Sequence, residues 1–376
     1  MRIAIINEAG AEERRVASTP EAVQNLLADG HQVFVQTGAG QNAGFYDDQY
    51  QEAGATVTPD LTSTLGDQGV VLTVGDLSGQ ELTDLTSDHL VIGLFDPVWD
   101  ARPAQAVAAT GAAVLSLDLV PRSTRAQAVD VLSSTATVVG FQAVLMAAER
   151  YPKLFPLLIT AAGTIPPAKI VVLGAGVAGL QAMAIARRLG ATVEGFDIRP
   201  EALEQIRSLG ARSIEIEGPE GQETPEEQNA RNQAGLIPYL AAADIVFTAA
   251  AIPGVRSPIL VTETMVEAMK PGSLLVDLSA QRGGNCSYTQ ADQEVEHQGV
   301  TILGPTNLAS GMALSASRMF ANNMVNLVRM LSNEGSLTID RKDDVIEPML
   351  VAIGGEIVHE RVQQNLASAT NPEVAS

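Results

Sequence analysis

The chain has 376 residues, enough for two domains and too many for one ordinary hydrophobic core. Hydrophobic residues make up 46% and charged residues 18%, a balance typical of a globular protein. Acidic residues outnumber basic ones by 44 to 23, and the net charge of −21 argues against binding to nucleic acid or to anionic lipid.

Cysteine content and hydropathy argue against disulfides, thiolate metal clusters and membrane spans. Cys286 is the only cysteine, which excludes an intrachain disulfide and a thiolate metal cluster. The N-terminal sequence MRIAIINEAG predicts a first strand and lacks the apolar stretch of a signal peptide. Two uncharged stretches, Val131–Ala148 and Ile170–Ala186, are interrupted by hydroxyl residues or glycines and do not predict membrane spans. We therefore expect a soluble protein without direct membrane insertion.

The first third of the chain alternates short apolar strands with helical patterns. Helices are predicted over about Pro20–Ala28 and Ala104–Ala109. The expected strands are Arg2–Ile6, Gln32–Gln36, Val70–Val74, Leu90–Phe95 and Ala113–Leu117. Near-continuous apolar strands separated by helices predict a parallel sheet covered on both faces.

The rest of the chain repeats this plan. Val131–Ala148, apolar on most faces, is interpreted as a buried connecting helix, and a long helix over about 316–331 is expected to return the chain to the first domain. Gly218–Gln233 is polar and predicts a loop, and a frayed tail is expected after about Ala367. The expected strands are Lys169–Leu173, Thr192–Phe196, Ser213–Ile216, Asp244–Ala249, Ser273–Leu278 and Val300–Leu303.

These patterns predict the fold class α/β, with two Rossmann-like, doubly wound parallel-sheet domains and a cleft between them. The discontinuous first domain is expected to comprise residues 1–136 and 310–376. The second is expected to comprise residues 137–309.

A glycine-rich turn follows the strand Lys169–Leu173 directly, with the sequence Gly174-Ala175-Gly176-Val177-Ala178-Gly179. A helix from about Val177 and the strand ending at Phe196 come next, with Asp197 at that strand's end. In this context the first glycine permits the tight turn, the second lets the backbone approach a pyrophosphate, and the third allows close helix–strand packing. The unit therefore predicts a dinucleotide-binding site.

The acidic residue indicates which dinucleotide is bound. Asp197 can accept both ribose hydroxyls, and its charge repels a 2′-phosphate, so NAD(H) is favoured. Arg199 leaves NADP open, since an arginine there can accept that phosphate.

A dehydrogenase that oxidises an alcohol or amine needs a base. The four histidines are His31 and His89 before strands, His297 in an acidic EVEHQG turn, and His359 near the C-terminus. None has a site-like setting, and no metal-ligand pattern occurs in the sequence.

The polar segment PRSTRAQAVDVLSS, residues 121–134, is the conspicuous candidate in the first domain. If a helix begins near Thr124, Gln127 and Asp130 share one face, and Arg122 can reach Asp130. A capped helix start with a solvated face is the alternative interpretation.

At this point the chain resembles the NAD(H)-binding component of proton-translocating NAD(P) transhydrogenase. The resemblance rests on PRSTRAQAVDVLSS, on AAGTIPPAKIVVLGAGVAGLQAMAIARRLGATVEGFDIRP, on AAIPG and on MKPGSLLVDLSAQRGGNCSYT. It extends over nearly the whole chain and is patchy before about residue 110. Alanine dehydrogenase, which has the same fold, is the rival family.

Three residues separate the rivals. An alanine dehydrogenase carries a lysine where this chain has Thr73-Val74-Gly75, a histidine near Phe95-Asp96, and an aspartate at Gln281. All three are missing here, although its substrate-carboxylate arginine is matched by Arg15. Transhydrogenases need no such base, because hydride passes directly between two nicotinamide rings and no proton is released.

The resemblance implies roles for particular residues. Arg122, Gln127 and Asp130 would surround the nicotinamide and its ribose, with Gln127 reaching towards the NADP(H) held by a partner component. Further nucleotide contacts are implied for Ser133, Val177, Ile198, Arg199, Gln233 and Ala251. The family's mobile loop, with a G-Y-A-K-type sequence, is replaced here by the acidic GPEGQETPEEQNARNQ, which puts closure of that loop in doubt.

The resemblance also implies a homodimer on the cytoplasmic face of the membrane, assembled with an NADP(H)-binding component and membrane-spanning subunits. Because the membrane helices of some α subunits do not follow, the chain resembles the soluble α1 subunit of the split form, and a truncated chain would look the same. A free-standing amino-acid dehydrogenase and a non-catalytic NAD(H)-binding protein remain alternatives.

Overall fold

The computed structural model describes residues 1–8, 12–218, 223–252, 254–333 and 335–370. These residues form two compact units, which are described separately. Unit 1 comprises residues 1–135 together with 309–376, and unit 2 comprises residues 136–308.

Unit 1 is built on an eight-stranded sheet in the order β19-β18-β6-β5-β4-β1-β2-β3. Its first six strands in sequence run parallel, and β18 and β19 extend the β6 edge antiparallel. The strands are β1 (Arg2–Ile5), β2 (Gln32–Gln36), β3 (Thr56–Thr58), β4 (Gly69–Leu72), β5 (His89–Gly93), β6 (Ala113–Ser116), β18 (Leu350–Ile353) and β19 (Glu356–Ile357).

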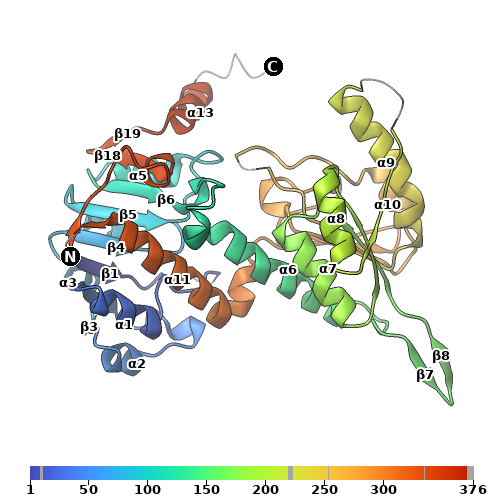
Figure 1. Ribbon diagram of the computed structural model, residues 1–376, viewed down its shortest axis with the longest axis horizontal. Coiled ribbons are helices and arrows are strands. Elements are labelled where there is room, and N and C mark those ends of the chain that lie inside the picture. The colour runs from blue at the N-terminus through green and yellow to red at the C-terminus, as the bar shows by residue number, and fades with distance from the viewer. Residues whose placement is uncertain (9–11, 219–222, 253, 334, 371–376) are drawn as a thin grey trace. The chain divides into compact units, whose positions relative to one another are not determined.

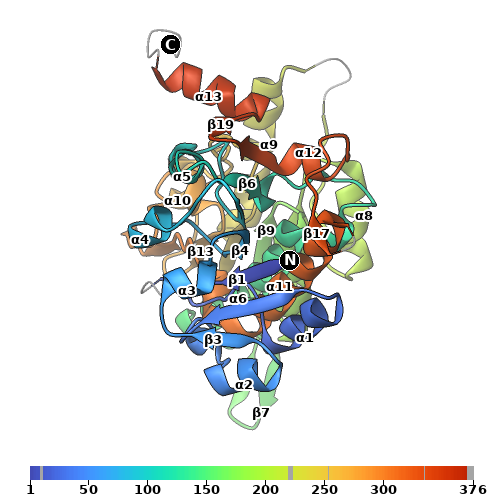
Figure 2. The ribbon, with the colours of Figure 1, turned by 90° about the vertical axis from the view of Figure 1, so that its left-hand side faces the viewer.

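Helices cover both faces of this sheet (Figures 1 and 2). Alternate residues of β1 point to opposite faces, so Ile3 and Ile5 pack in one core with Phe320 of α11, whereas Ala4 packs in the other with Val107 of α5. The helices are α1 (Pro20–Ala28), α2 (Asp47–Glu52), α3 (Leu61–Leu65), α4 (Gln80–Thr83), α5 (Arg102–Ala108), α11 (Ala313–Leu331), α12 (Ile346–Met349) and α13 (Glu360–Thr370).

Unit 2 contains a seven-stranded sheet in the order β11-β10-β9-β12-β13-β15-β14. All neighbouring strands are parallel except β14, which pairs antiparallel with β15. The strands are β9 (Lys169–Leu173), β10 (Thr192–Phe196), β11 (Arg212–Ser213), β12 (Ile245–Thr248), β13 (Leu274–Asp277), β14 (Glu294–His297) and β15 (Val300–Leu303). Both sheets therefore have the doubly wound order of a Rossmann fold, which confirms the predicted class.

The helices of unit 2 are α7 (Val177–Arg188), α8 (Pro200–Ser208), α9 (Pro225–Ala242) and α10 (Glu263–Glu267), and α6 (Val131–Arg150) begins in unit 1 and continues into unit 2. Of the described helices, α6 alone is long and apolar enough to cross a membrane by length and composition. Ala143, Val144 and Ala147 of α6 are fully buried in the unit 2 core, as in a helix packed within a globular domain.

Two two-stranded sheets complete the architecture: β7 (Leu158–Thr160) with β8 (Gly163–Ile165), and β16 (Ser332–Asn333) with β17 (Ser336–Leu337). The β7–β8 hairpin extends away from the rest of unit 2 (Figure 1), and every residue of its two strands is exposed.

Several local predictions were wrong, and capping explains two of them. Gly218–Gln233 is not all loop, because α9 begins at Pro225 behind Thr224, whose hydroxyl and backbone form a capping box with Glu227. No helix begins near Thr124. Instead α6 begins at Val131, because the Asp130 carboxylate accepts the backbone N–H of Ser133 at 2.9 Å and acts as its N-cap.

Other elements differ in extent. His297 ends the edge strand β14 rather than lying in a turn, and the strand expected at 213–216 is reduced to the two residues of β11. The connecting helix α6 is buried along one side only, since Leu145 is exposed. Helix α13 continues past Ala367 to Thr370, and the rest of the expected tail, residues 371–376, lies outside the described residues.

Candidate functional site

The glycine turn of unit 2 lies where the winding of its sheet reverses, between β9 and β12. Gly174 follows β9 with φ +101°, a left-handed conformation that favours glycine. A Cβ on Gly174 would lie 2.7 Å from the carbonyl oxygen of Ala249, which follows β12. Ligands of doubly wound sheets bind in the crevice at this reversal, so the absence of a side chain keeps it open.

The next two glycines have different surroundings. A Cβ on Gly179 would overlap the carbonyl oxygen of Gly174, so this glycine is required for α7 to pack against the turn. A Cβ on Gly176 would meet no atom within 4 Å, so nothing in the protein itself requires glycine there. Gly176 is the N-cap of α7, and as a glycine it has no side chain that could accept the first N–H groups of the helix. The free N–H groups of the first turn of α7 therefore border open space, as a pyrophosphate site requires.

A fourth glycine, Gly140, lies where α6 packs against the first turn of α7. On α6, a Cβ at Gly140 would overlap the carbonyl oxygen of Ala178. Gly140 therefore lets α6 approach the first turn of α7 closely. Sequence reasoning missed it, because a glycine inside an apolar helix carries no sign of the helix that packs on it.

Asp197 ends β10 and binds the glycine turn directly. Its carboxylate accepts the N–H of Ala175 at 2.8 Å and two hydrogen bonds from the Arg199 guanidinium, each of 2.9 Å. Burial raises the pKa of Asp197, but the hydrogen bonds from Arg199 and Ala175 more than offset this, so its pKa lies below the usual value. Asp197 is therefore ionised, and Arg199 is paired with it rather than free for a 2′-phosphate.

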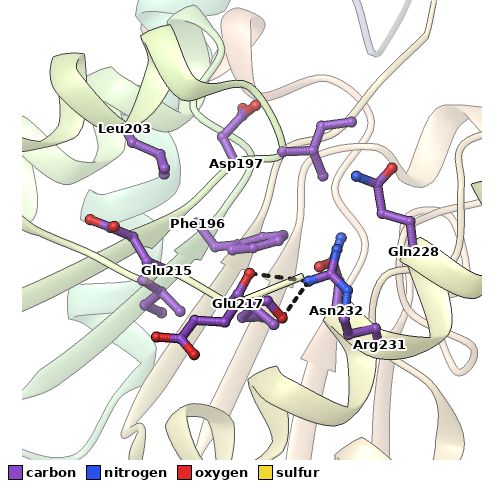
Figure 3. Close-up of a pocket in the computed structure, with 11 residues that line it drawn as sticks. Phe196, Asp197, Leu203, Glu215, Glu217, Gln228, Arg231 and Asn232 are labelled. Carbon is purple, nitrogen blue, oxygen red and sulfur yellow. Dashed lines mark hydrogen bonds between the residues drawn. The ribbon is translucent and has the colours of Figure 1, made fainter. Parts of the chain in front are cut away.

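A cavity of about 270 Å³ opens beside Asp197, as Figure 3 shows. Phe196, Leu203 and Ile214 supply apolar walls, and Gln228 and Asn232 from α9 supply amides. The mixture of flat apolar surface and a few polar groups is typical of a small-molecule site.

Arg231 of α9 binds the segment that carries Glu217, one of the acidic residues lining this cavity. Its guanidinium pairs with Glu223 at 3.0 Å. It also donates to the carbonyl oxygens of Ile216 and Glu217 at 3.1 and 3.3 Å, as the dashed lines in Figure 3 show. The chain on both sides of residues 219–222, which lie outside the described residues, is thus bonded to one side chain of α9.

The other expected contacts in unit 2 are distributed around the turn. Val177, Ile198 and Ala251 are exposed, at the first turn of α7, after β10 and after β12. Gln233 instead donates its amide to the carbonyl oxygen of Ile259 at 2.9 Å, so its nitrogen is already occupied within the protein.

A buried polar network that the sequence did not reveal holds the segment after β12. Asn285 accepts the N–H of Ala250 at 3.0 Å and donates to the carbonyl oxygens of Ala250 and Pro258, each at 2.8 Å. Asp277, which is fully buried, in turn accepts the N–H of Asn285 at 2.6 Å and the Thr289 hydroxyl at 2.6 Å. These contacts fix the segment that carries Ala251.

The remaining expected residues belong to unit 1. Arg122 and Gln127 are exposed, and Gln127 opens the single 3₁₀ turn η3 (Gln127–Val129). The Asp130 carboxylate accepts the Ser133 hydroxyl at 2.6 Å as well as its N–H, so it caps α6 rather than pairing with Arg122. The two long side chains that the sequence singled out are therefore displayed to solvent by a short, capped turn.

The sheet of unit 1 also reverses its winding, between β1 and β4, and here a side chain occupies the crevice. The Glu8 carboxylate accepts the N–H of Val74 at 2.7 Å, the N–H of Gly75 at 2.8 Å and the Thr73 hydroxyl at 2.6 Å. Burial raises the pKa of Glu8 to about 7, against the opposing effect of these hydrogen bonds.

Two of the histidines and the cysteine are buried. His31 and His89 are buried, and burial lowers the pKa of each, so both are neutral. Burial also raises the pKa of the Cys286 thiol to about 11, which leaves it protonated. The described residues contain no group of three or more side chains suited to a metal ion.

Comparison with known proteins places these features in a family. Residues 4–139 match the family description "Alanine dehydrogenase/PNT, N-terminal domain" and residues 143–360 match "Alanine dehydrogenase/PNT, C-terminal domain". The chain is 36% identical to an NAD(P) transhydrogenase subunit alpha chain of Rickettsia prowazekii, over 99% of this chain and 100% of that one. It is 26% identical to the alanine dehydrogenase of Bacillus subtilis, over 97% and 95% of the two chains.

A solved structure agrees. The transhydrogenase from Sinorhizobium meliloti matches with a TM-score of 0.87 and 40% identity, covering 95% of this chain and 100% of that one.

Proposed function

Because the chain belongs to the alanine dehydrogenase/PNT family, we propose that it is the NAD(H)-binding component of a proton-translocating transhydrogenase. In this role it holds NADH while hydride passes to NADP⁺ on a separate partner component. The observation that carries the proposal is the identity of 36% to a transhydrogenase α chain over the full length of both chains, against 26% to an alanine dehydrogenase.

Unit 2 holds the nucleotide in this proposal. The N–H groups at the start of α7 bind the pyrophosphate above Gly174, Gly176 and Gly179. The adenosine end occupies the cavity beside Asp197, between Phe196 and the amides of α9. The further contacts come from Ala175, Val177, Ile198, Arg199 and Ala251, and from Gln233 through its amide oxygen, since its nitrogen is bonded to Ile259.

Unit 1 supplies the residues that act at the nicotinamide. Arg122, Gln127, Asp130 and Ser133 are assigned to this role, with the exposed Gln127 reaching towards the partner's nucleotide. NADH itself supplies the hydride, and direct transfer between two rings releases no proton. The residues of the chain therefore orient the ring and exclude water rather than act as a base.

The structure disfavours the alanine dehydrogenase alternative. Arg15, the match to that family's substrate arginine, is already paired with Glu13, at 2.9 Å from Nε and 2.8 Å from the terminal nitrogen. Glu13 in turn accepts the Ser310 hydroxyl at 2.7 Å, which fixes the pair. With its guanidinium occupied, Arg15 is a poor site for a substrate carboxylate.

The charge around the carboxyl ends of β4, β5 and β6 argues the same way. Burial, and then the negative charges of Asp118, Asp100 and Asp96, raise the pKa of Asp76 to about 6. An amino or keto acid would have to bring a further carboxylate towards this group of aspartates. The environment repels such a substrate.

The proposal includes a homodimer on the cytoplasmic face of the membrane, attached through partner subunits. The support is the β7–β8 hairpin and the residues leading to it, where Leu157, Leu158, Ile159 and Ile165 are between 40% and 72% exposed. A hairpin of two three-residue strands has little stability of its own, so an apolar partner surface would stabilise it. Replacing Ile159 and Ile165 by Ser should give a monomer in sedimentation, and a dimer unchanged by both substitutions would contradict this interface.

A mixing experiment tests the function. The purified chain and NADH are added to a recombinant NADP(H)-binding component loaded with an NADP⁺ analogue, and reduction of the analogue is followed. No transfer, with NADH binding demonstrated, would contradict the transhydrogenase role and leave a non-catalytic NAD(H)-binding protein. Formation of NADH from alanine and NAD⁺ by the chain alone would establish the dehydrogenase instead.

Substituting Gln127 by Asn in the same assay tests the site. Shortening this exposed side chain should slow transfer about tenfold while NADH affinity stays within about twofold, because the proposed pyrophosphate site is in unit 2. A large loss of NADH affinity would show that Gln127 has another role.

A further inference from the structure

The turn that displays Gln127 is held only in part by its own backbone. The N–H of Val129 donates to the carbonyl oxygen of Ala126 at 2.9 Å, but the bonds made by Gln127 itself are long. The N–H of Gln127 lies 3.4 Å from the carbonyl oxygen of Thr124, and the N–H of Asp130 lies 3.4 Å from that of Gln127. Contacts from other segments therefore add to the orientation of the turn at Gln127.

Helix α11 supplies the most specific of these contacts. Asn323 donates its amide nitrogen to the carbonyl oxygen of Ala128 at 2.8 Å, and its amide oxygen accepts the Ser134 hydroxyl at 2.7 Å. One side chain thus connects the residue after Gln127 with the first turn of α6. Asn326, one turn further along α11, donates to the same Ala128 carbonyl oxygen at 3.1 Å.

Two other sets of contacts hold the turn. Ala126 and Val129 are buried in the core that also contains Phe320 and Met324 of α11, but apolar contacts have no direction. Arg125 binds both carboxylate oxygens of Asp343 and also pairs with Asp344, which anchors the chain two residues before Gln127. The amide of Asn323 makes the shorter of the two directional contacts to Ala128, the residue directly after Gln127.

We propose that Asn323 is a positioning residue for hydride transfer, which holds the carbonyl of Ala128 and so fixes the turn that presents Gln127. This inference rests on the proposed function. It assigns to α11 a role beyond covering the sheet. The Asn323 side chain would set the geometry of a segment that lies 195 residues earlier in the chain.

The test is single-turnover transfer at saturating NADH, with the chain mixed with the NADP(H)-binding component. Asn323→Ala should slow transfer about tenfold, because small displacements of a reacting geometry have large effects on rate. Its dissociation constant for NADH should stay within about twofold, since the glycine turn is in unit 2. Asn322→Ala is the matched control, because Asn322 is the exposed neighbour on α11 and should leave the rate unchanged.

Asn323→Asp separates positioning from a general loss of structure. Its carboxylate keeps the shape of the amide and still accepts from Ser134, but it cannot donate to Ala128 until it is protonated. The transfer rate of Asn323→Asp, divided by that of Asn323→Ala, should therefore rise as pH falls from about 6 to about 4, the range in which an aspartate takes up its proton. The charged groups on the packed segment, Asp130 and Arg125 with its partners Asp343 and Asp344, are common to both variants and cancel in this ratio.

Three results would overturn the inference: an unchanged rate in Asn323→Ala, a loss of rate matched by an equal loss of NADH affinity, or a pH-independent ratio. The isosteric Asp variant keeps the test available if the alanine variant unfolds. Failure of the unmodified chain to transfer hydride at all would be a different result, since it would contradict the proposed function itself.

Discussion

The parallel strands of the two sheets follow the same order, and each sheet reverses its winding beside its first strand. In unit 2 the chain leaves β9 through Gly174, and the N–H of Ala250 after β12 is bonded to the amide of Asn285. In unit 1 the corresponding crevice holds the Glu8 carboxylate, which takes the N–H groups of Val74 and Gly75 after β4.

This difference explains why only one of two similar sheets has the features of a dinucleotide site. A pyrophosphate needs backbone N–H groups and the space that glycine leaves. In unit 1 the Glu8 carboxylate itself stands in the crevice, and when ionised its charge opposes a second anion. Strand order therefore determines where a ligand crevice forms. The first residues after the strands determine whether a side chain of the protein fills it.

The largest effect on NADH affinity is expected from a side chain placed in the crevice of unit 2. Gly176→Ala places a Cβ where the structure has nothing within 4 Å, so the protein should fold normally. The same Cβ would enter the pyrophosphate site, and NADH affinity should fall by about 100-fold in a fluorescence titration, which is about 2.7 kcal/mol.

Gly179→Ala is the matched contrast. Its Cβ would overlap the Gly174 carbonyl oxygen, so thermal stability should fall together with NADH affinity. If Gly176→Ala bound NADH normally, the open space at the start of α7 would not be the pyrophosphate site.

A smaller effect is expected at the end of β10. Asp197→Asn removes the charge that opposes a 2′-phosphate and frees Arg199 from its ion pair. NADH affinity should fall about tenfold while NADPH affinity rises, as measured by competitive titration. Arg199→Ala serves as the control, because it frees no guanidinium and should bring no gain in NADPH affinity. An unchanged preference in Asp197→Asn would place discrimination elsewhere.

The smallest effect on nucleotide binding is expected in unit 1, where pH dependence of stability is the measurement. The folded-state pKa of Glu8, about 7, lies above its unfolded value of 4.5. Its stabilisation is therefore present below pH 4.5 and is lost as pH rises through 7, a change of about 3 kcal/mol in the free energy of unfolding.

Glu8→Gln should remove most of this slope from denaturant unfolding curves and leave NADH affinity within about twofold. A smaller slope of the same sign should remain from Asp76, whose pKa is also raised, to about 6, and Asp76→Asn isolates that contribution. An unaltered pH profile in Glu8→Gln would mean that the carboxyl group is not held as the structure shows.

Local sequence patterns were sufficient for much of the fold. The strands over 169–173 and 192–196 were predicted with their observed limits, because β-branched and apolar residues on either side of a glycine turn and its helix predict a βαβ unit. Errors arose where side chains bond to the backbone near helix ends. Thr224 caps α9 in a stretch that was expected to be a loop, since polar helix starts are similar in composition to loops. Asp130 starts α6 at Val131, where the apolar pattern placed the connecting helix, and not near Thr124.

Some residues of the candidate site could be predicted from local sequence spacing, and others could not. Gly174, Gly179 and Asp197 stand at fixed spacings in one βαβ unit, so the sequence by itself determined where the dinucleotide turn would form and which family the chain resembles. Arg199 was ambiguous from the sequence, because an arginine near the ribose fits either an ion pair or a 2′-phosphate. The structure pairs it with Asp197.

Tertiary structure alone decided what surrounds that turn. Glu8 with Val74, Asn285 with Ala250, and Asn323 with Ala128 are contacts across 66, 35 and 195 residues. The physical reason is that a hydrogen bond between distant residues leaves no period or spacing in the sequence of either partner. Helical and strand patterns express neighbours within a few residues, whereas the occupant of a crevice is known only when the chain has folded back upon itself.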